Sequence, residues 1–229
     1  MINKYIKLCI CILIFFSKLH SQDIISKINF DSSLNKIKLE LNKYILLNKN
    51  DSISIETIKF YISNIKLAID DSIIFQEPNS YHLIDFENIS TKSISLNYHK
   101  NIIFNKIKFN LGIDSATNVS GALGGDLDPT KGMYWTWQNG YINFKFEGKS
   151  NICQNKNNEF QYHLGGYLYP NNSIQEITLN IKNNKDLNIN INLDNLLPNL
   201  NLSDKNHIMS PSLESVKVSK IIANSFEIK

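Results

Sequence analysis

Apolar and polar residues alternate along most of the chain after residue 22, and this alternation predicts β-strands. The longest alternating stretch covers residues 53–69, in which Ile58, Phe60 and Ile62 fall on one face. The apolar positions change phase before Ile65, which predicts a β-bulge inside one long strand. β-Branched and aromatic residues dominate the stretch, and they favour a strand over a helix.

Shorter alternating stretches follow at short intervals, separated by turn residues such as Asp70, Pro78, Asn139 and Gly140. The further predicted strands are residues 28–30, 36–41, 72–75, 81–85, 92–96, 107–113, 134–146, 160–164, 174–181 and 187–193. Many short strands joined by turns predict an all-β fold, an antiparallel β-sandwich. Residues 212–226 instead place apolar residues at helical spacing after Ser210 and Pro211, which predicts one C-terminal amphipathic helix.

Residues 1–22 have the pattern of a secretory signal peptide: lysines, then the nine-residue apolar run LCICILIFF, then a polar end. The run is too short to cross a bilayer, which needs about 20 apolar residues. We therefore expect cleavage near Ser21 or Gln22, leaving residues 23–229 as a single domain without a membrane span. The alternative is a retained anchor.

The charge of the chain changes when this segment is removed. All 24 basic residues are lysine, and taking away the three lysines of residues 1–22 leaves 21, against 21 acids. A neutral chain without arginine is not expected to bind nucleic acid. After residue 22 the only cysteine is Cys153, so no internal disulfide can form. Cys153 lies in a polar stretch that predicts a loop, where its thiol is either a metal ligand or incidental.

No nucleophile elbow, P-loop or other catalytic motif occurs in the sequence, so we do not expect an enzyme. The candidate ligands are the histidines His82, His163 and His207, none of which has the short spacing of a local metal motif. An isolated histidine is more often structural than a metal ligand.

Two further groups of residues could carry chemistry. Trp135 and Trp137 are predicted to share one face of a strand, an arrangement that is usually part of a core. Asp114, Asp126 and Asp128 lie in or near the glycine-rich residues 121–132, where their oxygens could hold Ca²⁺. The alternative is that this segment is an ordered connection that positions the tryptophan strand.

Several sequence blocks occur in an order that resembles the MbnP-like family. They are residues 59–64 (KFYISN), 81–85 (YHLID), 111–114 (LGID), 127–129 (LDP), 132–141 (GMYWTWQNGY), 146–148 (FEG), 162–166 (YHLGG) and 207–210 (HIMS). The family contains copper-binding proteins named for a methanobactin operon and related to methanotroph surface copper proteins. The resemblance covers nearly all of residues 23–229.

The resemblance implies an exported β-rich protein, periplasmic or at the cell surface, that binds copper for acquisition or storage. It implies one Cu(I) held by histidines and by a tryptophan oxidised to kynurenine, with a di-haem cytochrome-peroxidase-like partner as the oxidase. His163 and His207 match the histidines of the blocks and are the expected copper ligands, with His82 as a further candidate. Trp135 or Trp137 would be the oxidised tryptophan. Some relatives carry a histidine beside the reactive tryptophan, whereas both positions are tryptophan here. The alternative is a non-metal binding module in which His163 and the tryptophans contact carbohydrate or protein.

Overall fold

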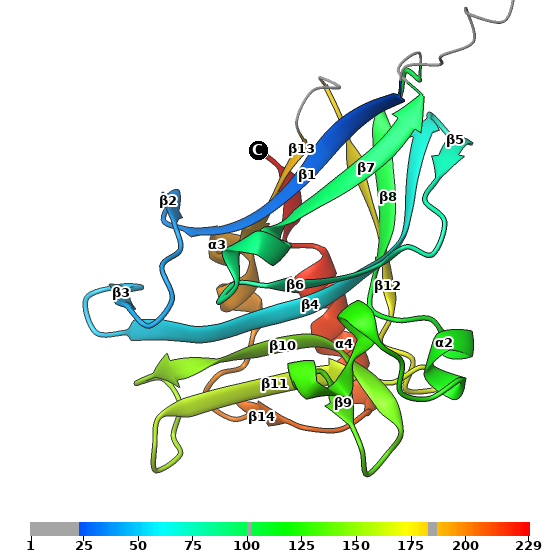
Figure 1. Ribbon diagram of the computed structural model, residues 1–229. Coiled ribbons are helices and arrows are strands. Elements are labelled where there is room, and N and C mark those ends of the chain that lie inside the picture. Colours follow the sequence, from blue (N-terminus) through cyan, green and yellow to red (C-terminus); the bar gives the residue numbers. More distant parts are fainter. Residues whose placement is uncertain (1–22, 100–101, 183–186) are drawn as a thin grey trace, which may run out of the picture.

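Two β-sheets, one of five strands and one of ten, make up the fold of this protein (Figure 1). The computed structural model describes residues 23–99, 102–182 and 187–229, so the predicted signal peptide lies outside the described residues. The two sheets confirm the predicted all-β sandwich. None of the helices within the described ranges is long and apolar enough to cross a membrane.

The five-stranded sheet is centred on β1 (Asp23–Leu34). Its other strands are β13 (Leu187–Asn192), β15 (Phe226–Ile228), β2 (Ile37–Lys38) and β7 (Ser93–His99). β1 pairs with β13 in parallel and with β2 and β7 antiparallel. The sheet is therefore mixed, which corrects the prediction of purely antiparallel pairing.

The ten-stranded sheet is centred on β4 (Ser52–Ile69). Its path runs through β12 (Gln175–Asn180), β8 (Lys106–Leu111), β4, β10 (Gly140–Ser150), β11 (Glu159–Gly165) and β14 (His207–Ile208). β3 (Tyr44–Leu46), β5 (Ser72–Gln76) and β6 (Tyr81–Asp85) also pair with β4, and β9 (Tyr134–Trp135) pairs with β10. β11 and β14 form a second parallel pair.

The bulge predicted inside the long strand is confirmed at Asn64. Between Ser63 and Lys66 the register of β4 against β8 shifts by one residue, and Asn64 adopts a left-handed φ of 55°. Because the extra residue reverses the alternation, Ile62 and Ile65 both face the core. The two halves of β4 can therefore contribute to one core despite the change of phase.

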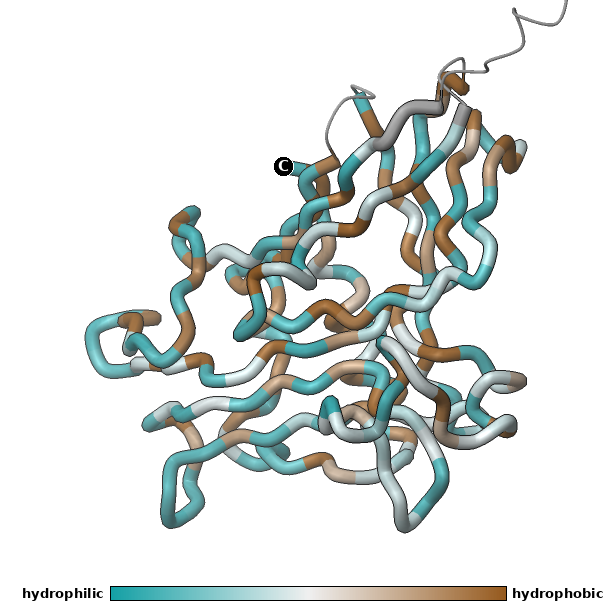
Figure 2. The backbone as a smooth tube through the Cα atoms, viewed as in Figure 1, coloured by the Kyte–Doolittle hydropathy of each residue, from teal (hydrophilic) through white to brown (hydrophobic). Residues whose placement is uncertain are grey.

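Aromatic residues join the two sheets at the centre of the core. Phe30 of β1 packs edge-on against Phe60 of β4, with ring centroids 5.8 Å apart, and Phe60 also contacts Phe144 and Phe226 at 5.4 and 5.7 Å. These side chains are all at most 5% exposed. Figure 2 shows hydrophobic and hydrophilic positions following one another along the strands, as expected for strands buried on one face.

Short helices and one longer helix complete the fold. They are the 3₁₀ turns η1 (Ile89–Lys92), η2 (Gly125–Leu127), η3 (Pro129–Lys131) and η4 (Leu197–Asn199), and the α-helices α2 (Ser115–Val119), α3 (Leu193–Leu196) and α4 (Leu213–Ala223). α4 confirms the predicted C-terminal helix and packs against β11 and β12. Phe226, expected inside the helix, lies in β15. Leu213, expected on its apolar face, is 67% exposed.

Two predicted strands differ from the observed ones. Residues 134–146 form a hairpin, β9 and β10, because Asn139 takes a left-handed φ of 49° before Gly140 and turns the chain. Of residues 36–41 only Ile37 and Lys38 are in a strand, since Asn35 and Lys36 both have positive φ in a tight turn.

Candidate functional site

Residues 112–139, which connect β8 to β10 and include β9, cover one face of the ten-stranded sheet; we call this segment the outer layer. It lies on the face of β4 that points away from the five-stranded sheet, where Tyr61 is fully buried. A second hydrophobic cluster forms between the outer layer and the sheet. Its members are Tyr61, Leu83, Ile113, Leu127, Met133, Trp135, Tyr141 and Ile142. The glycine-rich segment is therefore an ordered connection, as the alternative reading of the sequence proposed.

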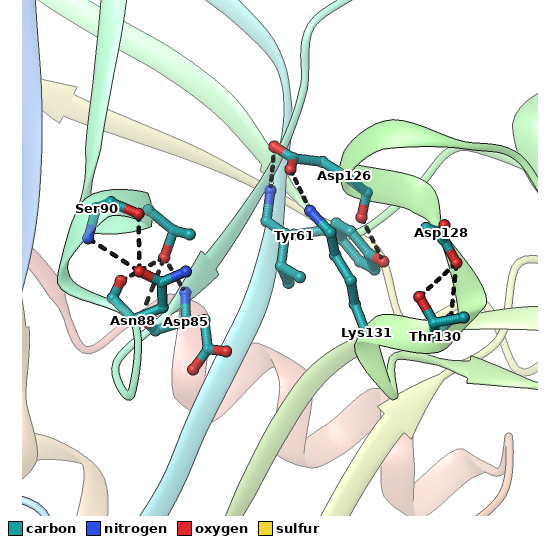
Figure 3. A network of polar contacts seen from close by, with 10 residues as sticks. Tyr61, Asp85, Asn88, Ser90, Asp126, Asp128, Thr130 and Lys131 are labelled. Atoms are coloured by element: carbon teal, nitrogen blue, oxygen red, sulfur yellow. Dashed lines mark hydrogen bonds and ion pairs between the residues drawn. The ribbon is translucent and has the colours of Figure 1, made fainter.

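Hydrogen bonds from the sheet fasten the outer layer in place (Figure 3). The Tyr61 hydroxyl donates to the Asp126 carbonyl at 3.1 Å, and the Asp126 carboxylate accepts from the Leu83 amide at 3.1 Å. The Lys131 ammonium contacts the other Asp126 oxygen at 2.7 Å. Burial raises the pKa of Tyr61 above its ordinary range, so the hydroxyl stays protonated and remains a donor.

The three aspartates proposed for calcium have other partners. Asp114 caps α2 by accepting from the Thr117 amide at 2.9 Å, and Asp128 accepts from the Thr130 amide at 2.8 Å. Asp126 accepts the hydrogen bond from the Leu83 amide and forms the ion pair with Lys131. Across the described ranges, no three or more His, Cys, Asp or Glu side chains are grouped to hold a metal ion. The expectation that these aspartates bind calcium is therefore not supported. Their carboxylates instead cap short helices and hydrogen-bond the outer layer to the sheet.

The two tryptophans lie in different environments. Trp135 ends β9 and is 6% exposed, whereas Trp137 lies in the turn of the hairpin and is 66% exposed. The prediction that they share a strand face is wrong, because the hairpin turn begins after Trp135. Their rings are nevertheless adjacent, with centroids 6.0 Å apart. Trp135 also packs on Gly165 of β11, where an added Cβ would lie 2.5 Å from the indole Cζ3.

His163 lies two residues before Gly165 on the same face of β11, and is 7% exposed. Its Nε2 is 2.6 Å from Glu147 Oε1 on the neighbouring strand β10. This hydrogen bond is the main reason that the pKa of Glu147 is lowered. An ionised carboxylate only accepts, so Nε2 carries the proton and the Nδ1 of a neutral imidazole keeps a free lone pair. Metal-binding histidines are commonly oriented by a carboxylate in this way.

Sequence reasoning did not identify Glu147. The residue lies in the FEG block, but its pairing with His163 depends on the register of β10 against β11, which sets Lys145 opposite His163 and Glu147 opposite Gln161. A loop of eight residues between the strands gives no turn signal that fixes this register. The partner therefore becomes visible only in the folded sheet.

His207 lies on the same face of the sheet as His163. It starts β14 and pairs with Gln161, which is two residues before His163. From strand spacing and rise, the Cα atoms of the two histidines are roughly 8 Å apart on the diagonal. His207 is exposed, and half-buried Met209 follows β14 directly. One face of the β14–β11 edge therefore carries His207, then His163, then the indole of Trp135 on Gly165.

His82 and Cys153 do not join this group. His82 pairs with Ile62, whose side chain faces the core, so it points to the opposite face of the sheet from Tyr61 and Leu83. Its Nε2 contacts Glu77 at 2.8 Å. Cys153 is in a loop as predicted, but it is 1% exposed within the main core, and burial raises the pKa of its thiol. A buried protonated thiol is a poor metal ligand.

The remaining donors fit copper better than a hard cation. Imidazole nitrogen suits copper, and a thioether such as that of Met209 favours Cu(I). His163 and His207 together offer two nitrogen donors, and no third His, Cys, Asp or Glu of the described residues joins them to form a metal-binding group. Intact indole has no lone pair for a metal, whereas an indole opened to an aromatic amine has one.

Comparisons with known proteins agree with this architecture. The structure of MbnP from Methylosinus trichosporium matches with a TM-score of 0.63, at 14% sequence identity over 85% of this chain and 87% of that chain. At this identity the match shows a shared fold. No curated protein sequence is significantly similar to the chain. The sequence model of the MbnP family matches residues 23–210, which is most of the described chain. The protein therefore belongs to the MbnP family.

Proposed function

We propose that the protein is an exported copper-binding protein that holds one Cu(I) for acquisition or storage, and that it is not an enzyme. Membership of the MbnP family supports a copper-related, exported role. The observation that carries the proposal is the hydrogen bond of His163 Nε2 to Glu147, which leaves Nδ1 as the ring nitrogen for a metal, two residues before Gly165, on which Trp135 packs. Export would place the protein in the periplasm or at the cell surface.

In this proposal His163 and His207 bind copper through ring nitrogens, and an oxidised Trp135 supplies the third donor. Bound copper would be a soft metal ion, for which imidazole nitrogen and thioether sulfur are suitable ligands. Glu147 holds the proton at His163 Nε2 and thereby fixes the tautomer that can bind metal. Trp135 and His163 are shielded from water, at 6% and 7% exposed, whereas His207 at the outer end of the site is exposed.

Trp135 is the better candidate for oxidation to kynurenine, since it is the indole that lies against β11, on Gly165, two residues after His163. Trp137 is 66% exposed in the turn, 6.0 Å from Trp135, and is accessible to a partner protein. We propose that a di-haem cytochrome-peroxidase-like oxidase is this partner. No nucleic acid and no membrane span are part of the proposed function.

Mass spectrometry of the protein isolated from its native host tests the modification. Kynurenine formation adds one oxygen and removes one carbon, so the mass rises by about 4 Da per modified tryptophan. Peptide mapping is expected to place this increase on Trp135, with one copper per chain in the same sample by elemental analysis. Unmodified tryptophans together with a copper-free sample would contradict the proposal.

The alternative function is a non-metal binding module that recognises carbohydrate or protein. The observation in its favour is the exposed indole of Trp137, since exposed aromatic rings are common in binding surfaces. If this alternative is correct, Trp137→Ala would abolish partner binding, and the wild-type protein would contain no copper. The copper proposal instead predicts that the histidines control metal content.

A further inference from the structure

A polar cavity of about 290 Å³ opens on the outer face of the ten-stranded sheet, away from His163 and His207. Ser63, Tyr81 and Asn110 form one row across it, since Ser63 of β4 is the register partner of both Tyr81 in β6 and Asn110 in β8. None of the residues that line it belongs to the candidate copper site. The volume is at the lower end for ligand pockets, so it suits one small molecule or one ring of a larger one.

The lining is rich in side-chain amides, and we call this site the amide cavity. Asn64, Gln76, Asn79 and Asn110 contribute four amides to the wall. Although the chain is rich in lysine, no lysine or histidine of the described residues lines the cavity. A site without cationic groups does not favour an anionic ligand.

Backbone conformations that are rare for residues other than glycine shape the cavity. Asn64 has φ 55° at the bulge of β4, and Asn79 has φ 49° in the turn before β6. Such conformations carry a free-energy cost and persist where the surrounding structure holds them. Here the backbone N–H of Asn64 donates to the backbone carbonyl of Ser80 at 3.1 Å. The side-chain Oδ1 of Asn64 accepts from Gln76 Nε2 at 3.0 Å. The wall is therefore ordered before any ligand arrives.

The carboxylates of the cavity are already occupied by protein donors. Asp114 accepts from the Thr117 amide at 2.9 Å and from the Tyr81 hydroxyl at 2.8 Å. Glu77 accepts from His82 at 2.8 Å. A divalent cation would need several of these oxygens at once, so a metal is disfavoured. By contrast, the side chains of Asn79 and Asn110 make no hydrogen bond to any residue in the described ranges, which leaves donors and acceptors free.

We propose that the amide cavity binds one ring of a neutral saccharide. Each sugar hydroxyl is both a donor and an acceptor, and an amide presents both functions at a fixed spacing. The free amides of Asn79 and Asn110 provide this pairing on two sides of the cavity. Tyr81 is the aromatic residue of the lining, and its hydroxyl is fixed by Asp114.

Titration of the ¹⁵N-labelled protein, residues 23–229, with D-glucose, D-galactose and N-acetyl-D-glucosamine tests this proposal by NMR. At least one sugar is expected to cause saturable chemical-shift changes in the backbone signals of residues 63–64, 76–81 and 110. The side-chain amide signals of Asn79 and Asn110 are expected to change as well. Asn110→Ala is expected to weaken binding about threefold to tenfold, as for the loss of one hydrogen bond. Asn79→Gly keeps the left-handed backbone while removing the free amide, and is expected to have an effect of similar size.

The matched control is Asn97→Ala, which removes an exposed amide from β7 in the other sheet and is expected to leave binding unchanged. The proposal is overturned if none of the three sugars gives saturable shifts up to tens of millimolar. It is also overturned if the chemical-shift changes occur around Trp137, or if Asn110→Ala and Asn79→Gly bind as the wild type does. Shifts at the same residues with CaCl₂ alone would identify a cation site instead.

Discussion

Gly165 is the residue whose small size most directly controls where the indole of Trp135 lies. A Cβ at this position would be 2.5 Å from Trp135 Cζ3 and 2.6 Å from the Tyr141 carbonyl oxygen. Both contacts are far shorter than van der Waals distance, and the carbonyl is backbone that cannot swing away. Glycine therefore lets the indole reach β11 beside His163.

Gly165→Ala is accordingly expected to destabilise the protein by about 1–3 kcal/mol and to push Trp135 outward. Urea unfolding would measure the free energy, and the tryptophan emission would shift to longer wavelength as Trp135 becomes solvated. Gly124→Ala is the matched control, because an added Cβ there meets nothing within 4 Å. Equal stability of the two variants would show that the close approach of Trp135 to β11 is absent.

Some residues of the candidate site could be predicted from the sequence alone, and others could not. His163 and His207 could be selected from their sequence blocks, because the blocks keep their order along the chain. Glu147 could not, since its contact with His163 depends on strand register. Likewise, the different exposure of Trp135 and Trp137 follows from a turn that alternation alone does not locate.

Among the elements, the strands were the most predictable and the outer layer the least. β6 was predicted with the observed ends, residues 81–85, and β4 with its bulge, because both alternate clearly. Residues 112–139 contain α2, η2 and η3, which are too short for a helical period to be visible. Their positions depend on tertiary hydrogen bonds such as that of Tyr61 with Asp126, which lie 65 residues apart.

The start of α4 allows a test of the cap that the structure shows at Ser212. Ser212 precedes the helix and its hydroxyl accepts from the Ser215 amide at 3.1 Å. Ser212→Ala removes this cap and is expected to lower the free energy of unfolding by about 1 kcal/mol, measured by urea denaturation. Ser212→Asp can still cap the helix and is expected to stay close to the wild type. A loss of stability in Ser212→Asp as large as in Ser212→Ala would contradict a capping role.

For the molecule as a whole, the sandwich class was predictable but the pairing of distant strands was not. β1 and β13 pair in parallel although they lie about 160 residues apart, and β14 adds to β11 across more than 40 residues. Alternation predicts that a segment is a strand, not which strand it joins. The mixed sheets, and with them the alignment of His207 beside β11, therefore come from the complete fold.

The pH dependence of stability is expected to include a contribution from Asp31, a residue of the central strand β1. Burial alone would raise its pKa, but hydrogen bonds from Lys38 at 2.5 Å and Lys92 at 2.9 Å outweigh it and lower the pKa. The folded pKa is thus below the unfolded value of about 3.9. The stabilisation is present above that value and is lost as the pH falls through the folded pKa.

Asp31→Asn is therefore expected to be less stable than the wild type at neutral pH, by about 0.5–1 kcal/mol for a partly exposed pair. The difference is expected to shrink as the pH falls below the ordinary aspartate pKa, because protonated Asp31 also loses its ion pairs. Urea unfolding at neutral pH and at about pH 3 measures both values. A difference that stays constant across this range would contradict the assignment.

The central claim is that His163 and His207, on one sheet face, bind copper with the help of a tryptophan. Anaerobic competition titration with a Cu(I) chelator, on protein isolated from its native host, tests it most directly. The account predicts one Cu(I) per chain in the wild type and in His82→Ala, which lacks a histidine of the opposite face. It predicts strongly weakened binding in both His163→Ala and His207→Ala. Wild-type affinity in both of these variants would contradict the account.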